Sequence, residues 1–269
     1  MATPFVKMHG LGNDFVVFDA RAQGLPAMGG GLAARLADRH TGIGCDQLIV
    51  IEDPREGGDA RMLIFNSDGG EVESCGNASR CVAQLLGAAK VETAGGLIEV
   101  APQGDGATVD MGRPRFDWDA IPLAYAMDTR DMPVGWDDLE SPSAVNVGNP
   151  HVIFFVDDLD AVPLATLGPQ IEHDALFPER VNVNVAQLIG ADHIRLKVWE
   201  RGAGLTRACG TGACATAVAA MRRGLTGRKV RIALPGGTLD IEWRADDHIA
   251  MTGPAATSFR GEVDLDSYA

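Results

Sequence analysis

Two cysteines, Cys75 and Cys209, lie near the ends of two stretches of sequence that match each other without a gap. Residues 61–77 read RMLIFNSDGGEVESCGN, and residues 195–211 read RLKVWERGAGLTRACGT. Each stretch begins with Arg, continues through an apolar segment typical of a strand, crosses a turn that contains Gly, and reaches Cys-Gly before a helical pattern. A match at one fixed offset indicates a duplicated unit. The duplication predicts two thiols at equivalent positions, each at the N-terminus of a helix.

Thiols in these positions suit proton transfer at a carbon atom. A helix N-terminus presents unpaired N–H groups and partial positive charge, which predicts a lowered pKa for a cysteine there and a place for a carboxylate beside it. Gly76 and Gly210 have no Cβ, so a ligand can approach the backbone closely. If two such sites face each other, one thiolate removes a proton from the α-carbon while the opposite thiol supplies one, which inverts the stereocentre. The N–H groups would stabilise the carbanion, so we expect no cofactor and no metal.

The duplication extends over most of the chain. Residues 10–20 (GLGNDFVVFDA) resemble residues 147–158, and residues 95–100 (GGLIEV) resemble residues 236–243. The matched blocks occur in the same order in both halves. We therefore expect two related domains without a long flexible linker between them.

The expected domains are an N-terminal half, residues 1–118, joined by the C-terminal tail 258–269, and a C-terminal half, residues 119–257. The predicted fold class is α+β: two pseudo-symmetric domains, each a curved sheet or barrel-like roll around a central helix, with the active site in the cleft between them. Apolar residues at helical spacing predict the central helices over Cys75–Ala89 and Cys209–Met221. A third helix is expected over residues 32–39. Short β-branched or aromatic runs predict strands at residues 15–20, 47–52, 61–65, 151–156, 194–199 and 228–234.

Composition narrows the class of function. The net charge is −14, which argues against nucleic-acid binding and favours a soluble protein of small-molecule metabolism. No segment reaches the apolar length of a membrane span, and the first ten residues lack the apolar core of a signal peptide, so we expect a cytoplasmic protein. Five cysteines, an odd number, indicate thiols and not a disulfide framework.

At these motifs the chain resembles the diaminopimelate epimerases, a pyridoxal-phosphate-independent family of two-cysteine enzymes. The resemblance covers nearly the whole chain in the right order. It rests on MHGLGNDFVVFD (8–19), GIGCDQL (42–48), NSDGGEVESCGNASRC (66–81), GNPH (148–151) and ERGAGLTRACGTGAC (200–214). It implies an isomerase that interconverts LL- and meso-2,6-diaminopimelate on the route to lysine and peptidoglycan, without a cofactor. It also implies a homodimer, which agrees with the prevalence of symmetric dimers.

The resemblance further implies roles for individual residues. Cys75 and Cys209 would be the acid/base pair, and His151 and Glu200 would adjust the pKa values of the thiols. The implied substrate-binding residues are Asn13, Gln47, Asn66, Gly76, Asn77, Asn149, Asn182, Glu200, Arg201, Gly210 and Thr211.

Each assignment has a structural alternative. Cys81 and Cys214 read as small core residues. An Asn beside Gly, such as Asn13 or Asn149, is also typical of a turn that satisfies its own backbone. Arg201 could form a solvated pair with Glu200, although an Arg fork beside a substrate cleft suits a carboxylate, and His151 could equally be a structural hydrogen-bonding residue.

Three other functions would explain part of the sequence. A proline or hydroxyproline racemase of the same two-thiol type would share the fold and chemistry but bind a small ring. A thiol redox or metal-binding protein would need closer cysteine spacing than Cys75/Cys81 and Cys209/Cys214 provide. A non-catalytic module descended from such an enzyme would not need the intact Cys, Glu and Arg positions.

Overall fold

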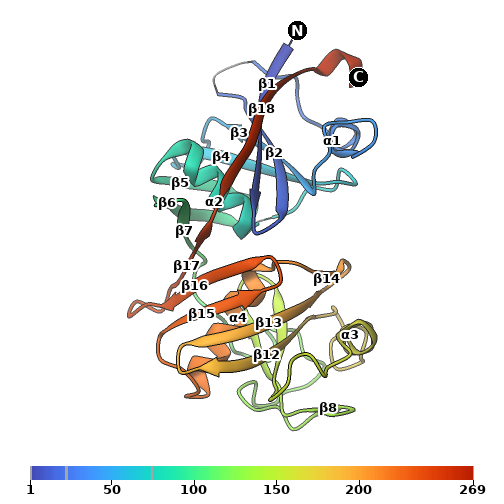
Figure 1. Cartoon of the computed structure of the whole chain (residues 1–269), viewed down its shortest axis with the longest axis vertical. Coiled ribbons are helices and arrows are strands. Elements are labelled where there is room, and N and C mark those ends of the chain that lie inside the picture. Colours follow the sequence, from blue (N-terminus) through green and yellow to red (C-terminus); the bar gives the residue numbers. More distant parts are fainter. Residues whose placement is uncertain (1, 22–23, 74, 269) are drawn as a thin grey trace. The chain divides into compact units, whose positions relative to one another are not determined.

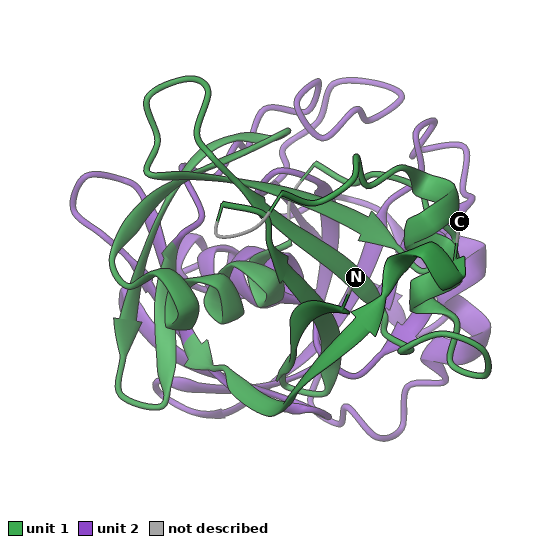
Figure 2. Cartoon of the chain, turned by 90° about the horizontal axis from the view of Figure 1, so that it is seen from above, with its two compact units in different colours: residues 1–109, 253–269 green, residues 110–252 purple. Residues whose placement is uncertain are grey.

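The computed structural model describes residues 2–21, 24–73 and 75–268. The chain divides into two compact units (Figure 2). Unit 1 comprises Met1–Val109 and Gly253–Ala269, and unit 2 comprises Asp110–Thr252. The expected domain bounds, 1–118 with 258–269 and 119–257, stay a prediction.

The described residues of unit 1 form one predominantly antiparallel sheet and two α-helices (Figure 1). The helices are α1 (Gly30–Ala37) and α2 (Gly76–Leu86), and a short 3-10 helix, η1 (Leu265–Tyr268), follows the last strand. Neighbouring strands follow the order β7 (Gly106–Asp110), β6 (Gly96–Gln103), β5 (Ala89–Thr93), β4 (Ala60–Asn66), β3 (Gln47–Glu52), β2 (Asn13–Asp19), β1 (Ala2–Gly10) and β18 (Ala256–Asp264).

The two helices of unit 1 cover opposite faces of its sheet. Val16, Phe18, Leu48 and Val50 belong to the apolar cluster that contains Leu36 of α1. Side chains alternate along a strand, so the intervening residues of β2 and β3 lie on the other face, which bends around α2 (Figure 2). This alternation decides which polar side chains reach the N-terminus of α2.

Unit 2 repeats this plan. Its sheet follows the order β10 (Ser143–Asn146), β11 (Pro150–Phe155), β12 (Asn182–Gly190), β13 (His193–Glu200), β15 (Lys229–Leu234), β16 (Gly237–Trp243) and β17 (Ile249–Pro254). A short strand, β14 (Gly204–Thr206), pairs with β13, and β8 (Gly135–Trp136) pairs with β9 (Leu139–Glu140). The helices are α3 (Leu164–Glu172) and α4 (Gly210–Arg222).

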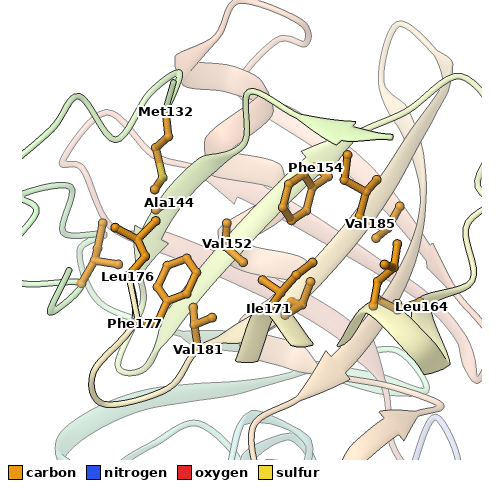
Figure 3. Close-up of a cluster of buried hydrophobic side chains, with 14 of the residues drawn as sticks. Met132, Ala144, Val152, Phe154, Leu164, Ile171, Leu176, Phe177, Val181 and Val185 are labelled. Carbon is orange, nitrogen blue, oxygen red and sulfur yellow. The ribbon is translucent and has the colours of Figure 1, made fainter. Parts of the chain in front are cut away.

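The sheet of unit 2 packs against α3 on one face and against α4 on the other. Val152 and Phe154 of β11 pack with Val183 and Val185 of β12 in the cluster that contains Ile171 of α3 (Figure 3). The alternate residues of both strands face α4, which also contacts β15 and β16. Every residue of α4 from Gly212 to Ala220 is buried. The sheet therefore wraps one small-residue helix, as the α+β expectation requires.

Sequence patterns placed most of these elements. The expected strand at residues 47–52 is β3, and both predicted Cys-Gly helices are confirmed. Helix α2 ends at Leu86, earlier than predicted, because Gly87 has a φ of 82° that closes the helix. Helix α3 was not predicted, since it follows Pro163 and contains Pro169, both of which interrupt a helical pattern.

Within the described part of the chain, no helix is both long enough and apolar enough to span a membrane.

Candidate active site

Both thiols are carried by residues that cap a helix. Cys75 precedes α2 with extended backbone angles (φ −148°, ψ 109°), and Cys209 precedes α4 in the same way (φ −121°, ψ 110°). The carbonyl of Cys75 accepts the first helical hydrogen bond from the N–H of Ser79, at 2.9 Å. Cys209 plays the same part for Ala213, at 3.0 Å. The equivalent placement predicted from the repeat is confirmed within each unit.

Cys209 lies in a closed environment. It is 3% exposed. Its Sγ accepts a hydrogen bond from the N–H of Gly212 at 3.3 Å and lies 3.5 Å from Oγ1 of Thr211. Burial, and after it the negative charge of Glu200, raise the pKa of the Cys209 thiol well above its ordinary value. The expected lowering of this pKa is wrong for Cys209 in this structure, because loss of solvation outweighs the helix N-terminus.

Gly212 is the helix residue that allows this contact. A Cβ at this position would lie 3.2 Å from Sγ of Cys209 and 3.1 Å from Val198. Both separations are tighter than ordinary van der Waals contact, so a side chain here would push the sulfur away from the N–H group. The Gly-rich start of α4 is thus a packing requirement.

Glu200 reaches the same sulfur from the end of β13. The β13–β14 hairpin pairs Glu200 with Gly204 and brings Oγ1 of Thr206 to 2.5 Å from Oε1 of Glu200. Besides burial, the negative charge of this carboxylate acts on Cys209 and raises the pKa of its thiol. Burial raises the pKa of Glu200. The expected influence of Glu200 on the thiol therefore has a structural basis in unit 2.

His151 occupies a fully buried position among asparagines. Its Nε2 lies 2.9 Å from Oδ1 of Asn149, and its Nδ1 lies 3.2 Å from Oδ1 of Asn184. The side chain of Asn184 continues the chain to α4, donating from Nδ2 to Gly212 O and to Oγ1 of Thr216, each at 2.9 Å. Burial lowers the pKa of His151 to about 4, and the charge of Arg201 adds to this effect. The ring is therefore neutral at pH 7.

Asn182 and Arg201 are linked at the start of β12. Asn182 Oδ1 accepts from the backbone N–H of Arg201 at 2.9 Å, and its Nδ2 donates to Pro150 O at 2.8 Å. The Arg201 side chain is exposed, with Nη1 donating to Glu179 O at 2.9 Å. Asn182 thus ties together the two loops that carry Asn149 and Arg201.

Gly202, which follows Arg201, is anchored by a buried carboxylate. Glu172, at the end of α3, is 2% exposed. Its Oε1 accepts from the N–H of Gly202 at 3.0 Å and its Oε2 accepts from Nε1 of Trp199 at 2.8 Å. Glu172 therefore fixes the backbone beside Arg201, a role that no motif in the sequence indicated.

Three candidate residues of unit 1 share the α2 face of the sheet. Strand pairing places Phe15 opposite Gln47, and Gln47 opposite Asn66. Gln47 Nε2 donates to Asn66 Oδ1 at 2.9 Å. Asn13 lies on the same face, two residues before Phe15. Strand alternation thus brings Asn13, Gln47 and Asn66 to one face.

Asn13 connects this face to the start of α2. Its Oδ1 accepts from Nδ2 of Asn77 at 3.1 Å and lies 4.0 Å from Sγ of Cys75. Asn77 Oδ1 in turn accepts from Nη2 of Arg80 at 2.9 Å, and Arg80 is fully buried. The guanidinium therefore determines which atom of the Asn77 amide faces Asn13.

A charged network holds the other side of Asn13. Its Nδ2 donates to Asp46 Oδ2 at 3.0 Å, and Arg39 bridges Asp46 and Asp14 with contacts of 2.7 and 2.6 Å. Nζ of Lys7 lies 2.5 Å from Asp14. Although burial acts in the opposite direction, hydrogen bonds from Arg39 and Lys7 hold the pKa of Asp14 well below its ordinary value. The charged network therefore fixes the orientation of the Asn13 amide, with Nδ2 toward Asp46 and Oδ1 toward Asn77.

Sequence reasoning missed the supporting residues of both units. One of them had a visible signal: the run NVNV at 182–185 alternates Asn and Val, so Asn184 had to share a face with Asn182. Glu172 and Asp46 had no comparable signal, because their partners are distant in sequence. Arg80 lies one helical turn after Asn77, but this spacing is too common in helices to be a signal. Cys81 and Cys214 are fully buried, as predicted for core residues, and burial raises the pKa of Cys81 to about 12. Over residues 2–21, 24–73 and 75–268, no group of three or more His, Cys, Asp or Glu side chains is arranged as a metal site.

Comparison with known proteins decides the family. The sequence model of diaminopimelate epimerase matches residues 5–116 and 143–258. The chain belongs to the diaminopimelate epimerase family. It is 70% identical over 269 residues to the diaminopimelate epimerase of Erythrobacter litoralis, covering 100% of both chains. It is 60% identical to that of Rhizorhabdus wittichii, covering 100% of this chain and 98% of the relative.

The fold is shared with more distant proteins. The structure of a probable proline racemase from Agrobacterium radiobacter K84 matches with a TM-score of 0.69 at 16% identity, covering 98% of this chain and 93% of that one. At this identity the likeness concerns the fold alone.

Proposed function

We propose that this member of the diaminopimelate epimerase family interconverts LL- and meso-2,6-diaminopimelate, and so serves lysine and peptidoglycan synthesis. The observation that carries the proposal is the repeated Cys-Gly helix start, occupied by a thiol in each unit, in a chain that is 70% identical over its full length to a diaminopimelate epimerase.

The proposed reaction is a two-base proton transfer by Cys75 and Cys209. A thiolate removes the α-proton of the substrate and becomes a thiol, while the opposite thiol protonates the other face and becomes a thiolate. The raised pKa of Cys209 supports a thiol there at neutral pH, ready to donate. Removal of its proton would then leave a thiolate close to Glu200, so Glu200 is proposed to adjust the acidity of Cys209.

The helix starts supply the electrostatics. In α4 the N–H of Gly212 points to the sulfur, so we assign the N–H groups of Gly210 and Thr211 to the substrate carboxylate. In α2 we assign the same role to Gly76 and Asn77. Positive charge and N–H donors around the carboxylate stabilise the negative charge that develops at the α-carbon, and no cofactor or metal is needed for that step.

The second amino-acid head group distinguishes diaminopimelate from a small ring such as proline. The exposed guanidinium of Arg201 offers donors to a distal carboxylate, in a loop that Asn182 and Glu172 hold in place. Asn13, Gln47, Asn66 and Asn149 are proposed as further contacts to the substrate. We propose that His151 adjusts the pKa values of the thiols, as the resemblance implies, and that it also acts on the site through Asn149.

The test is an assay of purified protein with LL-diaminopimelate, followed by chiral analysis of the product. Cys75→Ala and Cys209→Ala should each abolish epimerisation, because each sulfur serves one face of the carbon. Cys81→Ala and Cys214→Ala are matched controls in the same two helices and should affect stability alone. Normal turnover in either of the first two variants would exclude the two-thiol mechanism. Faster racemisation of proline than of diaminopimelate would exclude the proposed substrate.

Cell compartment and assembly are part of the proposal. A mechanism based on two reduced thiols suits the cytoplasm. We propose a homodimer on the general prevalence of symmetric dimers, which sedimentation of the purified protein would test.

A further inference from the structure

A chain of hydrogen bonds joins Gly212 of α4 to Asn184, His151 and Asn149. The donor and acceptor in each bond can be assigned by starting from Gly212. Asn184 Nδ2 lies 2.9 Å from the carbonyl oxygen of Gly212. A carbonyl oxygen only accepts hydrogen bonds, so the NH₂ group of Asn184 must be on this side. Its Oδ1 must then face Nδ1 of His151, at 3.2 Å. An amide oxygen also only accepts, and the proton of His151 is therefore on Nδ1.

The next link fixes the far nitrogen of the ring. His151 is fully buried and its pKa of about 4 keeps it neutral at pH 7, so the ring carries one proton. With that proton on Nδ1, Nε2 has a lone pair and accepts. The Asn149 amide lies 2.9 Å from Nε2 with Oδ1 toward the ring. Two acceptors in contact repel, and a half-turn of the amide replaces Oδ1 by Nδ2 without changing its shape.

We propose that Asn184 is a positioning residue which, through His151, turns the Asn149 amide so that its oxygen faces the ligand and accepts a hydrogen bond from a substrate ammonium group. The identification of the ligand as an amino acid rests on the proposed function. The proton on Nδ1 is assigned from the Gly212 carbonyl, and the lone pair on Nε2 follows from that assignment together with the burial of a neutral ring. Asn149 then recognises a substrate ammonium group. The reacting carboxylate is left to the N–H groups at the helix starts, and the distal carboxylate is left to Arg201.

A doubly protonated ring is the competing arrangement. It would satisfy both amide oxygens as they lie, but it would bury a cation completely, and the groups in contact with the two ring nitrogens are neutral amides. Burial of a charge without an opposite charge is far more costly than a half-turn of an amide. The neutral ring with its proton on Nδ1 is therefore the arrangement that the contacts favour.

The direct test is ¹⁵N NMR of histidine-labelled wild-type protein at neutral pH, with the His151 signals identified by their loss in His151→Gln. We expect a bonded proton on Nδ1 and none on Nε2. A proton on Nε2, alone or together with one on Nδ1, would overturn the proposal. This measurement needs no substrate, so it stands whether or not diaminopimelate is the ligand.

Two variants of Asn184 and Thr216 test the positioning role. Asn184→Leu removes the acceptor for Nδ1, so the proton should move to Nε2 and KM for diaminopimelate should rise more than kcat falls. Thr216→Val keeps the Gly212 contact and should keep the proton on Nδ1. A proton that stays on Nδ1 in Asn184→Leu would show that Asn184 does not set the ring.

The role of the Asn149 oxygen is tested by comparing ligand affinity between a variant that keeps an acceptor oxygen at this position and one that has none. Calorimetry with meso-diaminopimelate should show Asn149→Asp binding roughly tenfold tighter than Asn149→Leu, because a carboxylate still accepts from an ammonium group. Equal or weaker binding by Asn149→Asp would mean that Asn149 does not accept from an ammonium group. Failure of the wild-type protein to bind diaminopimelate would instead reject the proposed function, while the NMR result would still decide the direction of the chain.

Discussion

Single residues in unit 2 show how burial changes chemistry. Cys209 begins a helix, which by itself favours the thiolate, yet burial and Glu200 raise the pKa of its thiol. His151 is neutral for the same reason, because a buried ring resists protonation. The Cys209 thiol and the His151 ring are thus held in their uncharged forms by the surrounding protein.

The influence of Glu200 on Cys209 can be measured by alkylation. In a Cys75→Ala background, Glu200→Gln should lower the pH midpoint for alkylation of Cys209 by iodoacetamide, because the negative charge beside the sulfur is removed. Glu179→Gln, an exposed position in the same unit, is the control and should leave the midpoint unchanged. An unchanged midpoint in Glu200→Gln would show that burial alone sets the pKa of Cys209.

His151 should make stability depend on pH. Its pKa in the folded protein, about 4, is below the ordinary 6.5, so the unfolded chain takes up the proton first as the pH falls. The contribution is present in full above about pH 6.5 and is lost progressively toward pH 4, with a total of roughly 3 kcal/mol. Chemical denaturation should therefore show a larger loss of unfolding free energy over this range in wild-type protein than in His151→Gln. Parallel losses in the two proteins would contradict the buried neutral ring.

At the scale of elements, the loops near the candidate site are positioned by the hairpin and the helix that pack against them. The β13–β14 hairpin sets Glu200 against Cys209, and α3 supplies Glu172 to the loop that carries Arg201. Helix α3 can approach β13 because Gly168 has no side chain: a Cβ there would lie 2.5 Å from the Trp199 ring. The fit between α3 and Trp199 is therefore part of what holds the Arg201 loop.

Gly168→Ala tests this fit. The added methyl group overlaps the indole, so we expect a loss of about 1–3 kcal/mol in unfolding free energy and a rise in KM for diaminopimelate. Gly31→Ala in α1 is the matched control, because its Cβ would meet only Nη1 of Arg35 at 3.7 Å. That change should be neutral or slightly stabilising, as Ala favours a helix over Gly. Equal stability of the two variants would mean that α3 shifts to accommodate the methyl group.

For the whole molecule, the duplicated plan matters more than any one helix. Each unit bends a sheet around a helix that begins at Cys-Gly, and the family match covers both units. The two units support their thiols differently: unit 1 has the buried Arg80 in its helix, whereas unit 2 has Cys214 at the equivalent position and a neutral His–Asn chain. A duplicated frame with different supporting residues suits two thiols with different tasks.

Isotope labelling tests whether both thiols take part. In deuterium oxide, early product should carry deuterium at the inverted carbon while unreacted LL-diaminopimelate stays largely unlabelled, because the group that removes the proton is not the group that delivers the deuteron. The reverse reaction from meso-diaminopimelate is the control and should label only the LL product. Equal early labelling of substrate and product would indicate a single base.

The sequence by itself determined the pattern that repeats. Cys-Gly before a small-residue helical stretch predicted both helix starts, because the start of a helix depends on short-range geometry. That Asn13, Gln47 and Asn66 share one face was decided by strand pairing, which joins residues distant in sequence. The family resemblance rested on contiguous motifs, such as residues 66–81 and 200–214, which can be read directly from the sequence. The early end of α2 was missed, although Gly87 gave the signal.

Only the tertiary structure decided how the site residues behave. The pairing of His151 with Asn184, the anchoring of Gly202 by Glu172 and the hydrogen bond from Arg80 to the carbonyl of Pro254 join residues from different elements. The direction of the Cys209 pKa depends on how much protein surrounds the sulfur, and no local pattern records that quantity. Burial and long-range hydrogen bonds are sums over the folded chain, which is why they could not be derived from the order of residues.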